Sequence, residues 1–264
     1  QELTSGDIIL DPGLNHAYVS SNDVALPSAD LKRNCIYYPL LCLLICGFLF
    51  NTRNFRFRSM LKSRAVIESH ASSCVLLSSI GCSELITRCL KCYVGRLRPN
   101  FYNMCSFNLE TLVCTASNKE QTESRMSFPS GHSSMSFCSM GVLTLYILGK
   151  FRLMQNDEIT AFANPLPFDG TRDKFKNANV GRYPYNFIRR TKKMYCLCAI
   201  YIPLSYAFYA STSRLVDNWH HPSDVVYGSL LGVLASITGY HMFYPSVFST
   251  KSGCPLAWEF LGYA

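Results

Sequence analysis

Five stretches of mostly apolar residues recur along the chain, and each has about the length that a helix needs to cross a bilayer. They cover residues 34–52, 66–88, 131–149, 194–212 and 225–247. Several of these stretches are apolar on all sides and lack the polar face that a surface helix of a soluble protein keeps. The pattern therefore predicts an all-α protein, a polytopic bundle of transmembrane helices, in preference to a soluble domain with a large core.

The second apolar stretch is the least regular of the five. It contains four ionisable residues, Glu68, His70, Glu84 and Arg88. Ionisable groups are costly at membrane depth, so we expect these side chains to face the interior of the bundle and to be candidates for function.

Composition agrees with a membrane protein and argues against two other classes. Only 16% of the residues are charged and 13% are aromatic, and the net charge of +8 comes from basic residues between the apolar stretches. No basic region alternates with stacking aromatics, so nucleic acid is not an expected partner. The thirteen cysteines show no zinc-site spacing, and most of them, such as Cys42 and Cys138, lie in apolar runs as small hydrophobic residues.

The basic residues are distributed unequally between the two sides of the predicted bundle. The segments 53–64 and 150–193, together with Lys251, contain 16 of the 25 lysines and arginines, whereas the opposite side has eight and Arg88 lies near a boundary. Positive loops favour the cytoplasm. The N-terminal segment, the loop 89–130 and the short turn 213–224 are then predicted to share the extracytoplasmic face.

Three cations lie in or beside the segments at that face. Lys91 and Arg98 belong to the stretch KCYVGRLRP, and Arg214 begins the stretch RLVDNWHHPSD. A phosphate monoester carries about two negative charges, which fixed cations must hold, and arginine does so with two parallel hydrogen bonds. Any one cation could serve only solubility, but three at one face beside two histidines indicate an anion site.

The segment Pro-Ser-Gly-His, residues 129–132, is typical of the start of a helix. Ser130 is the expected N-cap, and the amides of Gly131 and His132 would point out of the positive end of the helix. Such a helix start can bind an anion, and glycine allows the backbone to approach it closely. A helix cap without a ligand would show the same four residues.

The last predicted span opens with His220, His221 and Pro222. Proline suits the first helical position, so we expect the histidines at the exposed lip of this helix. Asp224 lies within the first turn, where its carboxylate could orient the His220 ring and leave the other ring nitrogen free to attack. His132 could then protonate the leaving alkoxide.

These segments together resemble a known family. The order Lys-x6-Arg-Pro, Pro-Ser-Gly-His and Ser-Arg-x5-His-x3-Asp is similar to the signature of the type 2 phosphatidic acid phosphatase superfamily. Within it, GRLRP, SFPSGHSS and DNWHHPSDV most resemble the lipid phosphate phosphatases, as does the segment DPGLNHAY at residues 11–18. The resemblance covers nearly the whole chain.

The resemblance implies a role for each motif residue. His220 would attack phosphorus and become a phosphohistidine, Asp224 would orient it, and His132 would protonate the leaving group and later activate water. No metal and no cofactor would be needed, because cations stabilise the charge. The residues expected to hold the phosphoryl oxygens are Lys91, Arg98, Ser130, Gly131 and Arg214.

The resemblance also implies the domain organisation and the location. Residues 1–264 would form a single membrane domain of six spans, of which the first would precede Gln1, so the chain is expected to be N-terminally incomplete. The segment 150–193 is longer than usual and is predicted to be an irregular cytoplasmic insertion loop. The substrate would be a lipid phosphate at the extracytoplasmic or lumenal face of the plasma membrane or an endomembrane, and a homo-oligomer is left open.

Two cysteines differ from the others because they share a polar loop. Cys105 and Cys114 lie in the predicted extracytoplasmic loop 89–130, where an oxidising compartment permits a disulfide. Two free thiols are the alternative, since the sequence does not fix the geometry that a bridge needs.

Three alternatives remain at this stage. The same fold could act on sphingosine 1-phosphate or glucose 6-phosphate instead of phosphatidic acid. A catalytically inactive relative could serve as a membrane scaffold, but the presence of every motif residue favours an enzyme. A channel or transporter would leave the gathering of three motifs at one face unexplained.

Overall fold

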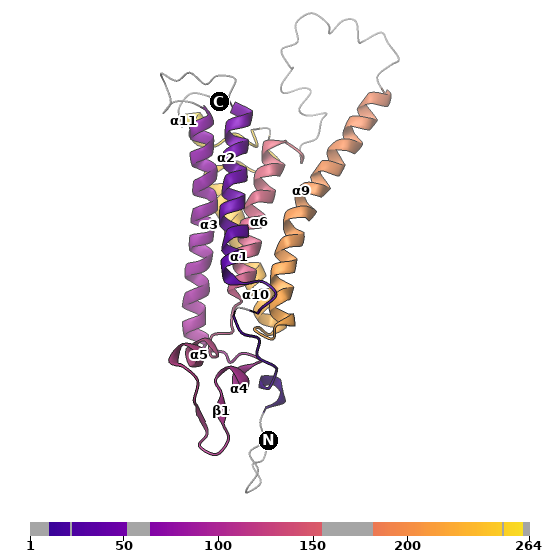
Figure 1. Ribbon diagram of the computed structural model, residues 1–264. Helices are drawn as coiled ribbons and strands as arrows, with labels where there is room; N and C mark the ends of the chain where they lie inside the picture. Colours follow the sequence, from indigo (N-terminus) through magenta and orange to yellow (C-terminus); the bar gives the residue numbers. More distant parts are fainter. Residues whose placement is uncertain (1–10, 22, 52–63, 155–181, 250, 261–264) are drawn as a thin grey trace, which may run out of the picture.

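The structure is a computed structural model, and it describes residues 11–21, 23–51, 64–154, 182–249 and 251–260. Long helices that run side by side form a bundle (Figure 1). The first of them is assembled from α1 (Ser28–Lys32), the π-helical turn η2 (Arg33–Tyr37) and α2 (Tyr38–Asn51). The other long helices are α3 (Arg64–Val94), α6 (Gly131–Lys150), α9 (Arg182–Val216) and α10 (Pro222–Phe243).

Short elements occupy the segments outside the long helices. They are the 3₁₀ turn η1 (Pro12–Leu14), α4 (Phe101–Met104), α5 (Asn118–Glu123), α11 (Ala257–Phe260) and the antiparallel strands β1 (Phe107–Asn108) and β2 (Val113–Cys114). The protein is therefore helical apart from one small hairpin within the described residues, as the apolar pattern predicts.

Four helical stretches within the described residues are long and apolar enough to cross a membrane. They are Ser28–Leu49, Arg64–Val94, Lys193–Val216 and Pro222–Phe243. The predicted span 131–149 folds as α6 but is not among the four, so the count of five spans is not confirmed. The reason is composition, because α6 contains many serines, of which Ser133 and Ser136 are buried, and it contacts α2, α3, α9 and α10.

The ends of two helices differ from the predicted boundaries. Helix α3 continues to Val94, beyond the predicted end at residue 88, and α9 begins at Arg182, inside the segment 150–193 that the sequence assigns to an irregular loop. The last part of that segment is helical, while residues 155–181 lie outside the described residues. Polar residues near a helix end do not stop a helix whose apolar part is already formed.

The ionisable residues of α3 are only partly inside the bundle, contrary to the expectation. Glu68 is fully buried, with Lys150 Nζ at 3.1 Å and the hydroxyls of Tyr146 and Tyr244 at 3.1 and 3.2 Å from its Oε1. His70 and Arg88 are exposed. Arg88 instead pairs with Glu84 one turn away, with Nε and Oε1 2.7 Å apart, which satisfies both charges locally.

Helices α6 and α10 approach each other very closely. A Cβ atom at Gly228 would lie 2.5 Å from the carbonyl oxygen of Ser130, and one at Gly232 would lie 2.4 Å from that of Ser134. The two glycines are four residues apart on one face of α10, the spacing that lets transmembrane helices pack backbone to backbone. The contact fixes the start of α6 beside the start of α10.

The connections that contain the predicted motifs lie at one end of the bundle. The loop from α3 to α6, with α4, α5 and the hairpin, lies there together with the turn between α9 and α10 (Figure 1, lower end). The N-terminal segment before α1 lies at the same end, and α11 lies at the other.

Candidate active site

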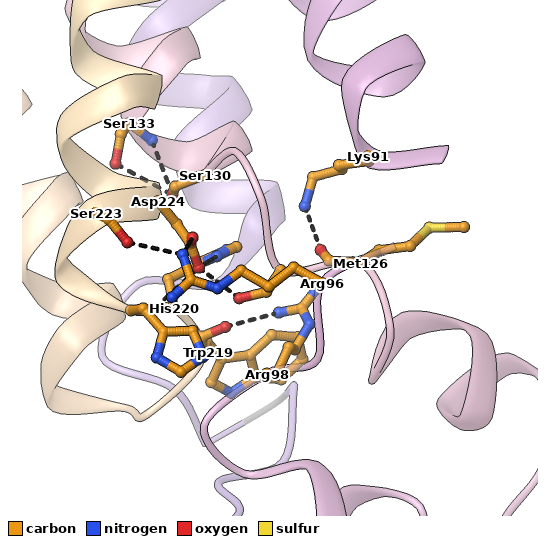
Figure 2. A network of polar contacts seen from close by, with 12 residues as sticks. Lys91, Arg96, Arg98, Met126, Ser130, Ser133, Trp219, His220, Ser223 and Asp224 are labelled. Carbon is orange, nitrogen blue, oxygen red and sulfur yellow. Dashed lines mark hydrogen bonds and ion pairs between the residues drawn. The ribbon is translucent and has the colours of Figure 1, made fainter. Parts of the chain in front are cut away.

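The three motif segments meet at this end of the bundle. Lys91 lies in the last turn of α3, Ser130 caps α6, and Arg214 lies in the last turn of α9. His220 follows in the turn to α10, and Asp224 lies in the first turn of α10. Figure 2 shows Lys91, Arg98, Ser130, His220 and Asp224 gathered at this end, each with its own polar contact.

His220 is buried, with 5% of its surface exposed, so the prediction of an exposed lip is wrong. The loop before α6 covers it: Arg96 and Ser127 of that loop both bind Asp224 beside it. Burial lowers the pKa of His220 well below 6.5; the nearby Asp224 opposes this effect, and the charges of Arg98 and Lys91 add to it. The imidazole is therefore neutral near pH 7, the form that can act as a nucleophile.

Asp224 lies one helical turn from His220. Its Oδ2 is 3.7 Å from His220 Nδ1, which is longer than a hydrogen bond. The same carboxylate accepts three shorter contacts, from Ser127 Oγ at 2.5 Å, from the His221 amide at 3.0 Å and from Arg96 Nη1 at 2.6 Å. Asp224 is thus fixed in front of the ring, and its role in orienting His220 stays a prediction.

Arg98 is held from several sides in a buried position. Its Nε donates to the Glu123 carbonyl at 2.7 Å, its Nη2 contacts Glu123 Oε2 at 2.9 Å, and its guanidinium lies 4.6 Å from the centre of the Trp219 ring. Burial lowers the pKa of Arg98 to about 10, and Glu123 and Asp224 oppose this effect. The group remains a cation at neutral pH.

Lys91 and Arg214 also have protein partners. Lys91 Nζ donates to the carbonyl of Met126 at 2.6 Å. Arg214 Nη2 contacts Asp217 Oδ2 at 2.9 Å and the carbonyl of Leu26 at 3.0 Å. The three predicted phosphate cations are thus brought to one end of the bundle, each tied to a different part of the chain.

The Pro-Ser-Gly-His segment starts α6 as predicted, with Ser130 as its N-cap. The Ser130 hydroxyl accepts from the Ser133 amide at 3.5 Å and from the Ser133 hydroxyl at 3.1 Å. The Ser130 amide donates to the Asp224 carbonyl at 3.0 Å, which joins the start of α6 directly to the start of α10. His132, two residues on, has a buried Nε2 with no hydrogen-bond partner among the described residues, so this nitrogen is available to a ligand.

A cavity of about 300 Å³ opens beside these groups, between α3 and the start of α6. Lys91, Gly131, Glu123 and Met126 are among the residues that line it. Gly131 is not required there by close packing, because a Cβ atom would meet only the Thr87 methyl group at 3.9 Å.

The structure joins Cys105 to Cys114 in a disulfide, with the two Cα atoms 5.1 Å apart. The two cysteines flank the hairpin, and Cys114 pairs with Phe107 in its short sheet. The bridge lies within the loop that joins Arg98 to Ser130, two of the predicted phosphate contacts.

Sequence reasoning missed several residues that shape this site. Arg96 binds both Ser223 Oγ, at 2.7 Å, and Asp224, and Trp219 packs under Arg98. Arg96 lies in the same GRLRP stretch as Arg98, and this indicates a position near the site. Nothing in the sequence shows that the two arginines have different partners. Within the described ranges, no three histidine, cysteine or acidic side chains are grouped so that they could hold a metal ion.

The chain is similar to known proteins over most of its length. Residues 72–248 match the family described as the PAP2 superfamily. Lipid phosphate phosphatase 1 of Arabidopsis thaliana is 30% identical over 205 residues, which are 75% of this chain and 52% of the relative. Probable diacylglycerol pyrophosphate phosphatase 1 of Schizosaccharomyces pombe is 24% identical over 245 residues, which are 89% of this chain and 70% of the relative.

A third relative is lipid phosphate phosphatase 2 of Arabidopsis thaliana, 28% identical over 201 residues, which are 73% of this chain and 58% of the relative. The chain thus spans little more than half the length of the two Arabidopsis relatives. No solved structure matches the chain.

Proposed function

Because the chain belongs to the PAP2 superfamily, we propose that it is a membrane-embedded lipid phosphate phosphatase that acts through a phosphohistidine at His220. The observation that carries the proposal is a buried neutral histidine at one end of the bundle. It has Asp224 one turn away, and Lys91 at the same end of the bundle lines a cavity of about 300 Å³. The relatives' names point to phosphorylated lipids as the substrate class.

The proposed reaction has two steps. His220 Nδ1 faces Asp224, so Nε2 attacks phosphorus and the bond to the lipid oxygen breaks. Burial and the charges of Arg214, Arg98 and Lys91 lower the pKa of His132 to about 3, so the ring is neutral in the free protein and takes up a proton when the anionic substrate binds. Its Nε2, which has no partner among the described residues, then gives this proton to the lipid oxygen. In the second step His132 takes a proton from water, the water oxygen attacks phosphorus, and the N–P bond breaks to release inorganic phosphate and restore His220.

The cations stabilise the charge that develops on the phosphoryl oxygens during both steps. Arg98 and Arg214 are held by Glu123 and Asp217, so their orientation is set before a substrate arrives. The amides at the start of α6 supply a further positive end. This arrangement supports a reaction that proceeds without a metal ion.

The test is phosphate release from purified protein in detergent, with EDTA present. The panel contains phosphatidic acid, diacylglycerol pyrophosphate, sphingosine 1-phosphate and glucose 6-phosphate. We expect turnover of the phosphorylated glycerolipids, and His220→Asn should abolish it while the protein keeps its helical circular dichroism and its elution volume. Brief incubation with labelled substrate should leave acid-labile phosphate on wild-type protein only.

Three results would contradict the proposal. Label on a serine or aspartate would exclude the phosphohistidine, and loss of turnover in EDTA would exclude the metal-independent reaction. Preference for glucose 6-phosphate would show that the substrate is not a lipid, and would favour the alternative in which the same fold acts on a sugar phosphate. Diacylglycerol pyrophosphate is in the panel because a relative named for this activity matches 89% of the chain.

A further inference from the structure

The segment ahead of α1 crosses the site end of the bundle and binds the turn that follows α9. We call its residues 16–21 and 23–26 the strap. Three consecutive residues of the turn each bind it. The contacts are Asp217 Oδ2 with the Ala25 amide at 3.1 Å, Asn218 Nδ2 with the Ala17 carbonyl at 3.5 Å, and Trp219 Nε1 with the Val19 carbonyl at 3.1 Å.

Asp217 is the centre of this connection. It is 5% exposed, and its Oδ2 accepts both the strap amide of Ala25 and Arg214 Nη2, the latter at 2.9 Å. Arg214 Nη2 also donates to the strap carbonyl of Leu26 at 3.0 Å, and Arg214 Nε donates to Ser213 Oγ at 3.1 Å. One edge of the guanidinium is therefore fixed by Asp217 and the strap together.

The other edge of Arg214 is open. Its Nη1 has no hydrogen-bond partner in the part of the chain that the structure describes. A guanidinium is planar and rigid, so holding Nη2 and Nε also fixes the direction in which Nη1 points. A fixed donor binds an anion at a lower entropic cost than a donor on a free side chain.

We propose that Asp217 is a positioning residue, which ties Arg214 to the strap and so orients its free edge toward the substrate's phosphate. This inference rests on the proposed function, because it takes Arg214 as a phosphate contact. A buried arginine also needs a counter-ion for stability alone, and the experiment must separate the two roles.

The experiment compares Asp217→Asn with Asp23→Asn. Asp23 lies in the strap, is exposed and bonds Ser20 Oγ at 2.6 Å, so it is a matched control outside the Arg214 contact. The probe is inorganic phosphate, the expected product, measured as the rise in melting temperature of the purified protein and as inhibition of turnover. We expect Asp217→Asn to weaken phosphate affinity roughly tenfold or more, since it removes a charge-assisted contact, and Asp23→Asn to leave it unchanged.

A double-mutant cycle with Arg214→Gln completes the test. If Asp217 acts through Arg214, Asp217→Asn should cause no further loss of phosphate affinity in the Arg214→Gln protein. An additive loss, or an Asp217→Asn protein that melts earlier but binds phosphate as the wild type does, would overturn the positioning role. If Asp217→Asn does not fold, Asp217→Glu takes its place, because it keeps the charge and displaces the carboxylate by one methylene.

The two proposals fail in different ways. A wild-type protein that binds phosphate but releases none from the lipid panel contradicts the proposed function only. Equal phosphate affinity in the wild-type and Asp217→Asn proteins contradicts the positioning role only. If phosphate does not raise the melting temperature of the wild-type protein at all, Arg214 holds no phosphate. This third outcome also overturns the positioning role.

Discussion

Arg96 binds Asp224 through the carboxylate oxygen other than the one nearest to His220. Its Nη1 donates to Asp224 Oδ1 at 2.6 Å, whereas Oδ2 is the atom that lies 3.7 Å from the His220 ring. The Arg96 side chain is 37% exposed and Asp224 is fully buried, so the arginine supplies charge to a carboxylate that has little contact with water. Arg96 can therefore affect His220, the proposed nucleophile, through Asp224.

We predict that Arg96→Gln lowers kcat roughly ten- to hundredfold with a smaller change in KM, because a hydrogen bond to a charged group contributes ~1.5–3 kcal/mol. Arg96→Lys should recover part of the loss, since it keeps the charge but not the planar donor pair. Steady-state turnover of the best lipid substrate measures both constants. Arg33→Gln is the control, because Arg33 forms an exposed pair with Asp30. Equal effects of the two glutamine variants would contradict a role for Arg96 at the site.

The residue types of the site could be predicted from the sequence, but their partners could not. The apolar pattern and the distribution of charge place Lys91, Arg98 and Arg214 at one face, and the charge of a phosphate explains why three cations would lie together there. Their contacts come from distant segments: Arg98 binds Glu123, 25 residues away, and Arg214 binds Leu26, 188 residues away. Only the folded chain brings such pairs together, which is also why the burial of His220 was not foreseen.

Among the helices, the contact between α6 and α10 joins the two halves of the site. Helix α6 contains Ser130 and His132 at its start, and α10 contains Asp224 in its first turn. Gly228 and Gly232 let the two backbones touch along this line. Any side chain at Gly232 must therefore push the two helix starts apart.

We predict that Gly232→Ala destabilises the protein by about 1–3 kcal/mol, the usual cost of overpacking, and lowers turnover more than the loss of stability alone explains. The added Cβ atom would lie 2.4 Å from the Ser134 carbonyl oxygen and 2.9 Å from the Cys138 amide nitrogen, and neither backbone atom can move alone. Thermal unfolding and turnover in the same detergent measure the two effects. Gly81→Ala is the control, since nothing lies within 4 Å of a Cβ atom there, and it should lower neither stability nor turnover.

The existence of the long helices could be predicted from hydrophobicity, whereas their ends and their place in the bundle could not. Helix α6 was predicted as a span like the others, yet its buried serines face neighbouring helices. Hydrophobicity measures how strongly a segment prefers lipid. A helix enclosed by other helices has little contact with lipid, so it does not need a strongly apolar composition. The start of α9 at Arg182 was missed for a related reason, because the polar residues around it resemble a loop.

At the scale of the whole molecule, the bundle has two chemically different ends. The end with His220 contains the disulfide-closed hairpin and the strap. The end of α2, the start of α3 and the start of α9, which flank the undescribed residues 52–63 and 155–181, lie at the other end (Figure 1). The segments 53–64 and 150–193, with Lys251, contain 16 of the 25 basic residues. The motifs thus lie at the end opposite to the helix ends that flank the basic segments, and the distribution of charge predicts the same arrangement without any motif.

We predict that the site end lies outside the cytoplasm, because loops rich in lysine and arginine are retained on the cytoplasmic side. An epitope tag inserted between Leu109 and Glu110, at the exposed turn of the hairpin, should bind antibody on intact cells or sealed vesicles of the matching orientation. A tag inserted between residues 165 and 166, in the basic segment, should bind antibody only after permeabilisation. Both tagged proteins must retain turnover, so that labelling reports the native fold. Labelling of the second tag alone before permeabilisation would reverse the orientation and place phosphate release in the cytoplasm, while leaving the geometry of the site unchanged.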